Sequence, residues 1–195
     1  MEKQTIVNLA RSFAGEAQAR SRYTVYAQIA RKEGQEWIAQ MFEETAANEA
    51  IHAEEFLEQM QKLGGCSEHI DIAASYPYPL GTTQENLSYA ASGELQEHQQ
   101  IYPQYAELAR REGLDEAARL WIHIARIEGV HHNTFRQLFT QLSDGSLTQK
   151  PQPILWRCLN CGYTYESTKA LDSCPVCHKQ AGWQMGQVDT RMLKK

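Results

Sequence analysis

Two stretches of this 195-residue chain repeat each other, and that internal repeat restricts the fold more than any other feature of the sequence. Apolar side chains recur at helical spacing in four segments: 5–33, 36–63, 82–113 and 115–142. A connection of about twenty residues precedes the third segment, which begins with the capping-box pair Thr82 and Glu85. Two helix hairpins joined by such a crossover predict a mainly α chain folded as a four-helix bundle.

The two hairpins match each other at an offset of 79 residues. The first copy contains Tyr23, Tyr26, Ala27, Ala30, Glu33 and Gly34, and the second contains Tyr102, Tyr105, Ala106, Ala109, Glu112 and Gly113. At the same offset, Glu49-x-x-His52 recurs as Glu128-x-x-His131. Helical composition repeats easily by chance, but a matching Glu-x-x-His motif on both second helices does not. The repeat therefore predicts that these four residues share one site.

One pair of motifs breaks the repeat, because Gly15-Glu16 matches Gly93-Glu94 at an offset of 78. The third helix therefore holds one extra residue. A helix accommodates an extra residue as a π-bulge, and such bulges gather at functional sites. Pro103 lies in the same stretch and removes one backbone hydrogen-bond donor. We predict a π-bulge between Glu94 and Pro103.

The glutamates and histidines of the repeat are the predicted metal ligands. Residues three apart share a helix face, so the Glu and His of each motif point the same way. Two Glu-x-x-His motifs with one Glu from each partner helix, here Glu16 and Glu94, form the ligand set of a dimetal carboxylate bundle. Carboxylate oxygen and imidazole nitrogen suit iron or manganese, with zinc as the alternative. Glu97, one turn after Glu94, is either a further ligand or a solvated charge.

Four of the five cysteines form two C-x-x-C pairs near the C-terminus: Cys158, Cys161, Cys174 and Cys177. Such pairs predict a tetrahedral four-thiolate metal site. The spacing alone favours zinc, but beside a redox bundle it favours iron, because zinc transfers no electrons. Cys66 is expected to be an ordinary thiol. Pro, Gly and Ser residues predict a linker near 145–153, between domains at 1–146 and 153–195.

Charge and hydropathy exclude several other classes of protein. The net charge of -5 argues against nucleic-acid binding, which needs cationic contacts to phosphates. No apolar run reaches the roughly 18 residues of a membrane helix, and the first residues do not lead into the apolar core of a secretory signal. Together with the paired cysteines, these features predict a cytoplasmic protein with no nucleic-acid or membrane partner.

Taken in order, the motifs resemble those of the rubrerythrin family over nearly the whole chain. They are Gly15-Glu16, Tyr23, Glu49-x-x-His52, Gly93-Glu94-x-x-Glu97, Tyr102-Pro103, Glu128-x-x-His131 and the four-cysteine tail. The resemblance implies a ferritin-like bundle with two iron ions and a rubredoxin-like domain with one. It also implies a peroxidase that reduces hydrogen peroxide to water. Electrons would come from rubredoxin or a reductase fed by NAD(P)H, within a homodimer whose tails serve the partner's di-iron centre.

The resemblance also implies a role for each ligand in the bundle. Glu49 and Glu128 would bridge the two irons. Glu16 would be a terminal ligand of one iron, and Glu94 and His131 would be terminal ligands of the other.

Three further roles come from the same resemblance. Glu97 and His52 would exchange on the first iron as its redox state changes. Tyr23 and Tyr102 match the tyrosines that surround the metals in the family, and with Glu97 they are the candidate catalytic residues. In the tail, His178 replaces the glycine that usually follows the last cysteine of rubredoxin, which leaves the redox potential open.

Two other functions fit the same residues. A ferroxidase or iron-handling protein would use the bundle with iron as its substrate. A non-redox binding or interaction module would hold zinc in the tail.

Overall fold

The computed structural model of the protein describes residues 4–64 and 69–186, so Cys66 lies outside the described residues. The helices are α1 (Gln4–Lys32), α2 (Glu36–Lys62), α3 (Thr83–Gln96), a π-helical segment (Glu97–Ile101), α4 (Tyr102–Arg111) and α5 (Asp115–Ser143). The strands are β1 (Gln149–Cys158), β2 (Thr164–Lys169) and β3 (Gln184–Gly186), with a short 3-10 turn (Ala181–Trp183) before β3.

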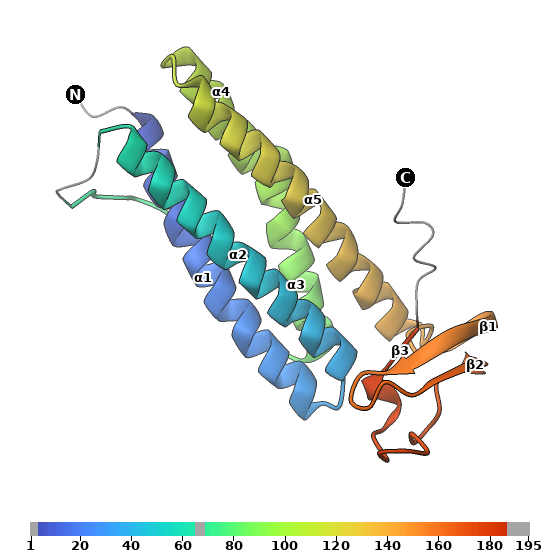
Figure 1. The fold of residues 1–195 in the computed structure, drawn as a ribbon. Coiled ribbons are helices and arrows are strands. Elements are labelled where there is room, and N and C mark those ends of the chain that lie inside the picture. Colours follow the sequence, from blue (N-terminus) through green and yellow to red (C-terminus); the bar gives the residue numbers. More distant parts are fainter. Residues whose placement is uncertain (1–3, 65–68, 187–195) are drawn as a thin grey trace.

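The helices form the predicted four-helix bundle. α1 packs on α2, and the third helix, built from α3, the π-helical segment and α4, packs on α5. Figure 1 shows the two hairpins side by side, with the connection after α2 running along the bundle to α3. Within the described ranges, none of the helices is long and apolar enough to cross a membrane.

The repeat extends to the way the helices begin and end. Gly34 and Gly113 follow α1 and α4 with φ of 77° and 75°, a left-handed conformation that favours glycine. The preceding glutamates cap the other hairpin: Glu33 accepts from the backbone N–H of Thr83, and Glu112 accepts from that of Thr5. Each hairpin therefore supplies a hydrogen-bond acceptor that caps the N-terminus of the other hairpin's first helix.

The start and the interior of the third helix also agree with the sequence-based predictions. The Thr82 side chain accepts from the backbone N–H of Glu85, and Glu85 accepts from that of Thr82, so the predicted capping box is present. The predicted π-bulge is confirmed as the π-helical segment, and Pro103 lies in the first turn of α4, where a missing N–H is tolerated.

The core divides into two apolar clusters along the bundle axis. One contains Tyr23, Phe42 and Phe135, and the other contains Phe56 and Trp121. Polar side chains are also buried inside the bundle: Glu16, Glu49, His52, Glu94, Glu128 and His131. Burying charged groups is costly unless they are paired or bind a cation, so this polar layer needs a specific explanation.

The tail forms a three-stranded antiparallel sheet in the order β2-β1-β3. Trp156 in the central strand pairs with Tyr165 on one side and Gly186 on the other, and its side chain is fully buried. The 3-10 turn meets the bundle where α1 turns into α2: a Cβ placed on Gly182 would lie 1.9 Å from the carbonyl oxygen of Gly34. Only glycine allows this approach.

The Pro-rich stretch predicted as a linker belongs to the first half of β1. Its pairing with β2 is irregular between Gln149 and Ile154. Pro151 and Pro153 lie in this interval, and proline cannot donate a hydrogen bond to a neighbouring strand. The sequence therefore marked a break in strand pairing there rather than an unpaired connection.

Candidate metal centres

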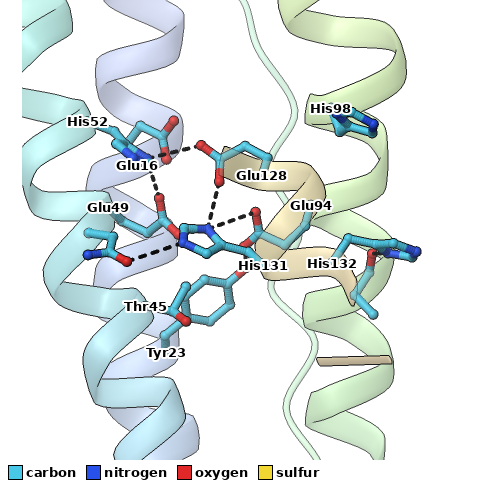
Figure 2. A network of polar contacts seen from close by, with 12 residues as sticks. Glu16, Tyr23, Thr45, Glu49, His52, Glu94, His98, Glu128, His131 and His132 are labelled. Carbon is cyan, nitrogen blue, oxygen red and sulfur yellow. Dashed lines mark hydrogen bonds and ion pairs between the residues drawn. The ribbon is translucent and has the colours of Figure 1, made fainter. Parts of the chain in front are cut away.

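The predicted ligands converge from all four helices of the bundle. α1 supplies Glu16, α3 supplies Glu94, and α2 and α5 each supply a Glu-x-x-His pair. Figure 2 shows the four carboxylates turned toward one another between the helices, with the two imidazoles beside them. Spacing of three residues on α2 and α5 places each glutamate and its histidine on the same inward face.

The ligand atoms form two groups that share two glutamates. Glu16, Glu49, His52 and Glu128 make one group, and Glu49, Glu94, Glu128 and His131 make the other. Within each group, one potential ligand atom per residue lies within 4.8 Å of all the others. Because Glu49 and Glu128 belong to both groups, they are positioned to bridge two metal ions.

Each histidine presents Nδ1 to both shared carboxylates. His52 Nδ1 lies 2.8 Å from Glu49 Oε2 and 3.0 Å from Glu128 Oε1. His131 Nδ1 lies 2.7 Å from Glu128 Oε2 and 3.2 Å from Glu49 Oε1. The Nε2 atom of His131 lies 3.3 Å from Asn48 Oδ1, which fixes the ring orientation.

Two tyrosines hold the single glutamates across the bundle. Tyr23 on α1 donates its hydroxyl to Glu94 on α3, and Tyr102 on α4 donates to Glu16 on α1. Both tyrosines are fully buried. The two bonds are related by the sequence repeat, so Glu16 and Glu94 are each oriented by the tyrosine of the other hairpin.

Three buried carboxylate oxygens test whether metal ions fit. Glu49 Oε1, Glu94 Oε2 and Glu128 Oε1 form no hydrogen bond, although a histidine Nδ1 lies within ion-pair distance of each, at 3.2, 3.7 and 3.0 Å respectively. Burial, with repulsion from Glu49 and Glu128, raises the pKa of Glu16 well above its usual value. Burial also raises the pKa of Glu94 to about 8. Protein groups alone therefore leave the negative charge of these carboxylates under-compensated, and divalent cations bound here would supply the missing positive charge.

In the metal-free protein, protonated histidines offset part of the negative charge of the buried carboxylates. Burial disfavours the charged form, but the hydrogen bonds that His52 donates to Glu128 and Glu49 raise its pKa to about 9. The same balance raises the pKa of His131 to about 12. Because a metal-bound imidazole must release its proton from the ligating nitrogen, metal ions would replace protons at Nδ1.

Glu97 differs from the other predicted ligands. It lies at the start of the π-helical segment, belongs to neither four-residue group, and is only half-buried. The other predicted ligands of the bundle are all buried. Glu97 therefore lies outside both ligand groups, and it lines a cavity between α1 and the third helix.

The remaining histidines of the bundle interior point elsewhere. His98 Nδ1 bonds the carbonyl of Ala125 at 2.6 Å, and His132 Nδ1 bonds the carbonyl of Ala91 at 2.7 Å. Figure 2 shows both rings away from the carboxylates. Sequence reasoning missed Asn48, because its counterpart in the repeat is Ile127 and no motif marks it.

The second candidate site lies in the tail. Cys158, Cys161, Cys174 and Cys177 each place one sulfur within 4.8 Å of the other three. Cys158 Sγ and Cys177 Sγ are 3.6 Å apart, as are Cys161 Sγ and Cys174 Sγ. Four converging thiols with no disulfide among them could hold an iron or zinc ion, both of which prefer tetrahedral sulfur ligands.

The two C-x-x-C loops share one backbone pattern. Gly162 N–H donates to the carbonyl of Cys158, and His178 N–H donates to that of Cys174, both at 2.9 Å. Gly162 and His178 both have positive φ, 76° and 58°. The backbone N–H of Lys179 and the side chain of Asn160 lower the pKa of Cys177 to about 6. The backbone N–H of Tyr163 likewise favours the thiolate of Cys161, but burial and the neighbouring thiols outweigh it and raise the pKa of Cys161 to about 12. Each loop therefore directs an N–H dipole at a sulfur, and in the metal-free protein the thiolate is favoured at Cys177.

The fold and both sites together define a class of protein: a di-metal carboxylate bundle joined to a small four-thiolate metal domain. Family comparison agrees with this assignment. The rubrerythrin family model matches residues 7–139, and a model described as the rubredoxin-like domain of rubrerythrin matches residues 156–182. The chain belongs to the rubrerythrin family.

Individual relatives cover most of the chain. A rubrerythrin of Porphyromonas gingivalis is 43% identical over 180 residues, 91% of this chain and 88% of the relative. A rubrerythrin of Clostridium perfringens is 42% identical over 93% of this chain and 94% of the relative. The solved structure of partially reduced nigerythrin has a TM-score of 0.64 at 26% identity, covering 94% of this chain and 86% of that one. These relationships establish the ferritin-like fold and support an iron-dependent oxidoreductase.

Proposed function

We propose that the protein is a non-haem di-iron peroxidase that reduces hydrogen peroxide to water. The observation that carries the proposal is the pair of four-residue ligand groups sharing Glu49 and Glu128. That arrangement suits two adjacent metal ions acting on one two-atom substrate. Iron bound there would supply Lewis acidity and the two electrons that cleave the O–O bond.

Side chains of this chain would prepare the site for that reaction. Tyr23 and Tyr102 hold Glu94 and Glu16 in fixed orientations and carry hydroxyl protons next to the ligand groups. Glu97 interacts electrostatically with Glu16 of the first group, and its position on a π-helical segment gives it a geometry distinct from its regular helical neighbours. We assign Glu97 as the mobile carboxylate that binds when charge on the metals increases.

The tail would return electrons one at a time through an iron ion held by the four cysteines. Within one chain the tail packs at the α1–α2 turn, and Glu49 lies about 20 Å from that turn, because α2 rises by about 1.5 Å per residue. This separation favours electron delivery between subunits. We propose a homodimer in which each tail serves the partner's bundle, with rubredoxin or an NAD(P)H-linked reductase as the external donor.

A surface feature supports this arrangement. A groove of about 370 Å³ between α2 and α5 is lined by His131 and Asn48. Apolar side chains flank it, with Val130 63% exposed and Ile127 39% exposed. The bundle is the acidic part of the chain and the tail the basic part, so charge complementarity favours association of a partner's tail with the bundle.

Cysteine variants test the electron-relay role. Cys161→Ala and Cys174→Ala should abolish sustained, reductase-linked peroxide consumption, because they destroy the thiolate site. The pre-reduced variants should still consume about one peroxide per bundle, since two ferrous ions hold two electrons. Cys66→Ala is the matched control and should retain sustained turnover. Normal sustained turnover in the C-x-x-C variants would refute the relay role.

A further inference from the structure

A cavity of about 360 Å³ lies beside the candidate di-metal site. α1 forms one wall, and α3, the π-helical segment and α4 form the other. The connection between α2 and α3 closes it from outside with residues 73–77. Three separate parts of the chain therefore enclose the cavity, which is more than a depression in the surface of one helix pair.

This cavity reaches the candidate metal site at Glu97 and Tyr102. Glu97 is the half-buried carboxylate of the site, whereas the other six predicted bundle ligands are buried. The groove at His131 reaches the site only behind the imidazole ring, through Nε2 and Asn48. A small molecule approaching the metals therefore has its most direct route through the cavity and past Glu97.

A glycine on α1 leaves room for the covering segment, residues 73–77, and two hydrogen bonds attach that segment to α1. Gly15 lies beneath Tyr76, whose ring carbon would be 3.5 Å from a Cβ on that glycine. The Tyr76 hydroxyl donates to the carbonyl of Arg11 at 2.9 Å. Arg22 donates from a terminal nitrogen to the carbonyl of Pro77 at 2.8 Å. The covering segment is thus attached to α1 near both ends of the cavity.

The charge on the cavity wall is cationic. Arg11 and Arg22 both line it, and the Nε atom of each is buried without a hydrogen-bond partner. Among the lining residues Glu97 is the single carboxylate. When Glu97 turns to a metal ion, the lining keeps two guanidinium groups and no counter-charge. A buried guanidinium N–H without a partner is a strong donor for a carboxylate.

We propose that this cavity binds organic hydroperoxides that carry a carboxylate, with Arg22 receiving the carboxylate and the peroxide group directed past Glu97. The inference rests on the proposed peroxidase function. It adds a substrate class, because the cavity is much larger than the two heavy atoms of hydrogen peroxide require. Arg22 is the recognition residue, because it projects from α1 toward the wall that holds Glu97 and its Nε forms no hydrogen bond. One of its terminal nitrogens would lie 4.0 Å from a Cβ on Gly93 of that opposite wall.

The reaction balances with the electrons that the proposed function already supplies. The O–O bond of ROOH breaks, two electrons and two protons are consumed, and the products are ROH and water. Iron held by Glu16, Glu49, His52, Glu94, Glu128 and His131 would supply the two electrons, and the four cysteines of the tail would hold the iron that restores them. The substituent R is unchanged, so the alcohol keeps the carboxylate and remains a ligand for the cavity.

Binding of the stable product alcohol tests the site without turnover. The iron-loaded oxidised protein should bind 3-hydroxy-3-methylbutanoate about tenfold or more tighter than its neutral match, 2-methyl-2-butanol, in calorimetric titrations. Arg22→Gln keeps a donor for Pro77 and should abolish this preference. Arg22→Lys keeps the charge and should retain part of it. Arg20→Gln changes the charge equally at an exposed position of α1 and should leave the preference unchanged.

Kinetics provide the second measurement. The ratio of kcat/KM for 3-hydroperoxy-3-methylbutanoate to that for tert-amyl hydroperoxide should be about ten or more in the wild type and should approach unity in Arg22→Gln. Equal affinities for the two alcohols, or a preference that Arg22→Gln and Arg20→Gln change equally, would overturn the proposal. Turnover of hydrogen peroxide is measured on the same samples. Its absence would refute the peroxidase function, while the binding titration still decides the cavity.

Discussion

Removing the metal ions should make the stability of the bundle depend strongly on pH. In the metal-free protein, burial raises the pKa of Glu94 from 4.5 to about 8, and carboxylate hydrogen bonds overcome burial to raise the pKa of His52 from 6.5 to about 9. Both groups bind protons more tightly when folded than when unfolded. Their contribution is therefore complete at low pH and is lost as pH rises, through about 8 for Glu94 and about 9 for His52.

The expected effect is large. One pKa unit corresponds to about 1.4 kcal/mol, and both groups lose stabilisation between about pH 5.5 and about pH 8.5. Glu49 acts in the opposite direction, because hydrogen bonds from the two histidines outweigh burial and lower its pKa to about 2. Its contribution is complete above about 4.5 and does not change in this window. We expect the free energy of unfolding to fall by at least about 3 kcal/mol across the window.

Urea unfolding of the chelator-treated protein, followed by far-UV circular dichroism, measures this directly. The metal-loaded protein should show the opposite trend, because metal binding releases protons and strengthens as pH rises. Glu94→Gln removes one titrating group and should flatten the metal-free dependence. If the metal-free protein were equally stable at about pH 5.5 and about pH 8.5, the conclusion that Glu94 and His52 bind protons more tightly in the folded state would be refuted.

Three further outcomes are expected. Tyr102→Phe and Tyr23→Phe should each weaken metal binding in the bundle by about tenfold, because each leaves a buried carboxylate without its hydrogen-bond donor. Competition with a chelator measures this, and unchanged affinities would show that the tyrosines do not orient the ligands. Glu97→Ala should slow peroxide turnover but leave the ferric-thiolate spectrum intact, and unchanged turnover would make Glu97 a bystander. His178→Gly should stabilise the tail by about 1 kcal/mol in chemical denaturation, because His178 has a φ of 58°; an unchanged midpoint would mean that its side chain compensates.

Much of the bundle could be predicted because the sequence repeats its own constraints. The offset of 79 joined two Glu-x-x-His motifs, and the failure of that offset at Glu94 predicted the π-helical segment. Helical periodicity fixes which side chains share a face, so the inward set followed from spacing alone. The ligand assignment to individual ions came from family resemblance rather than from this geometry.

Features that depend on tertiary contacts could not be predicted in the same way. The first half of β1 read as a linker because Pro151 and Pro153 dominate it, yet the neighbouring strand still pairs around them. Asn48 became relevant only when α5 brought His131 beside it. The cavity required the packing of residues 73–77 across α1, which no local pattern encodes.

If bound iron in the bundle reduces peroxide and the tail then returns electrons to that iron, one measurement tests both steps. The fully reduced, iron-loaded protein is mixed in a stopped-flow instrument with hydrogen peroxide or with dioxygen, and the ferric-thiolate absorption is followed. The account predicts faster oxidation by peroxide, with the thiolate signal appearing after the bundle is oxidised. Faster oxidation by dioxygen, with accumulation of a ferric mineral, would contradict it and favour iron storage.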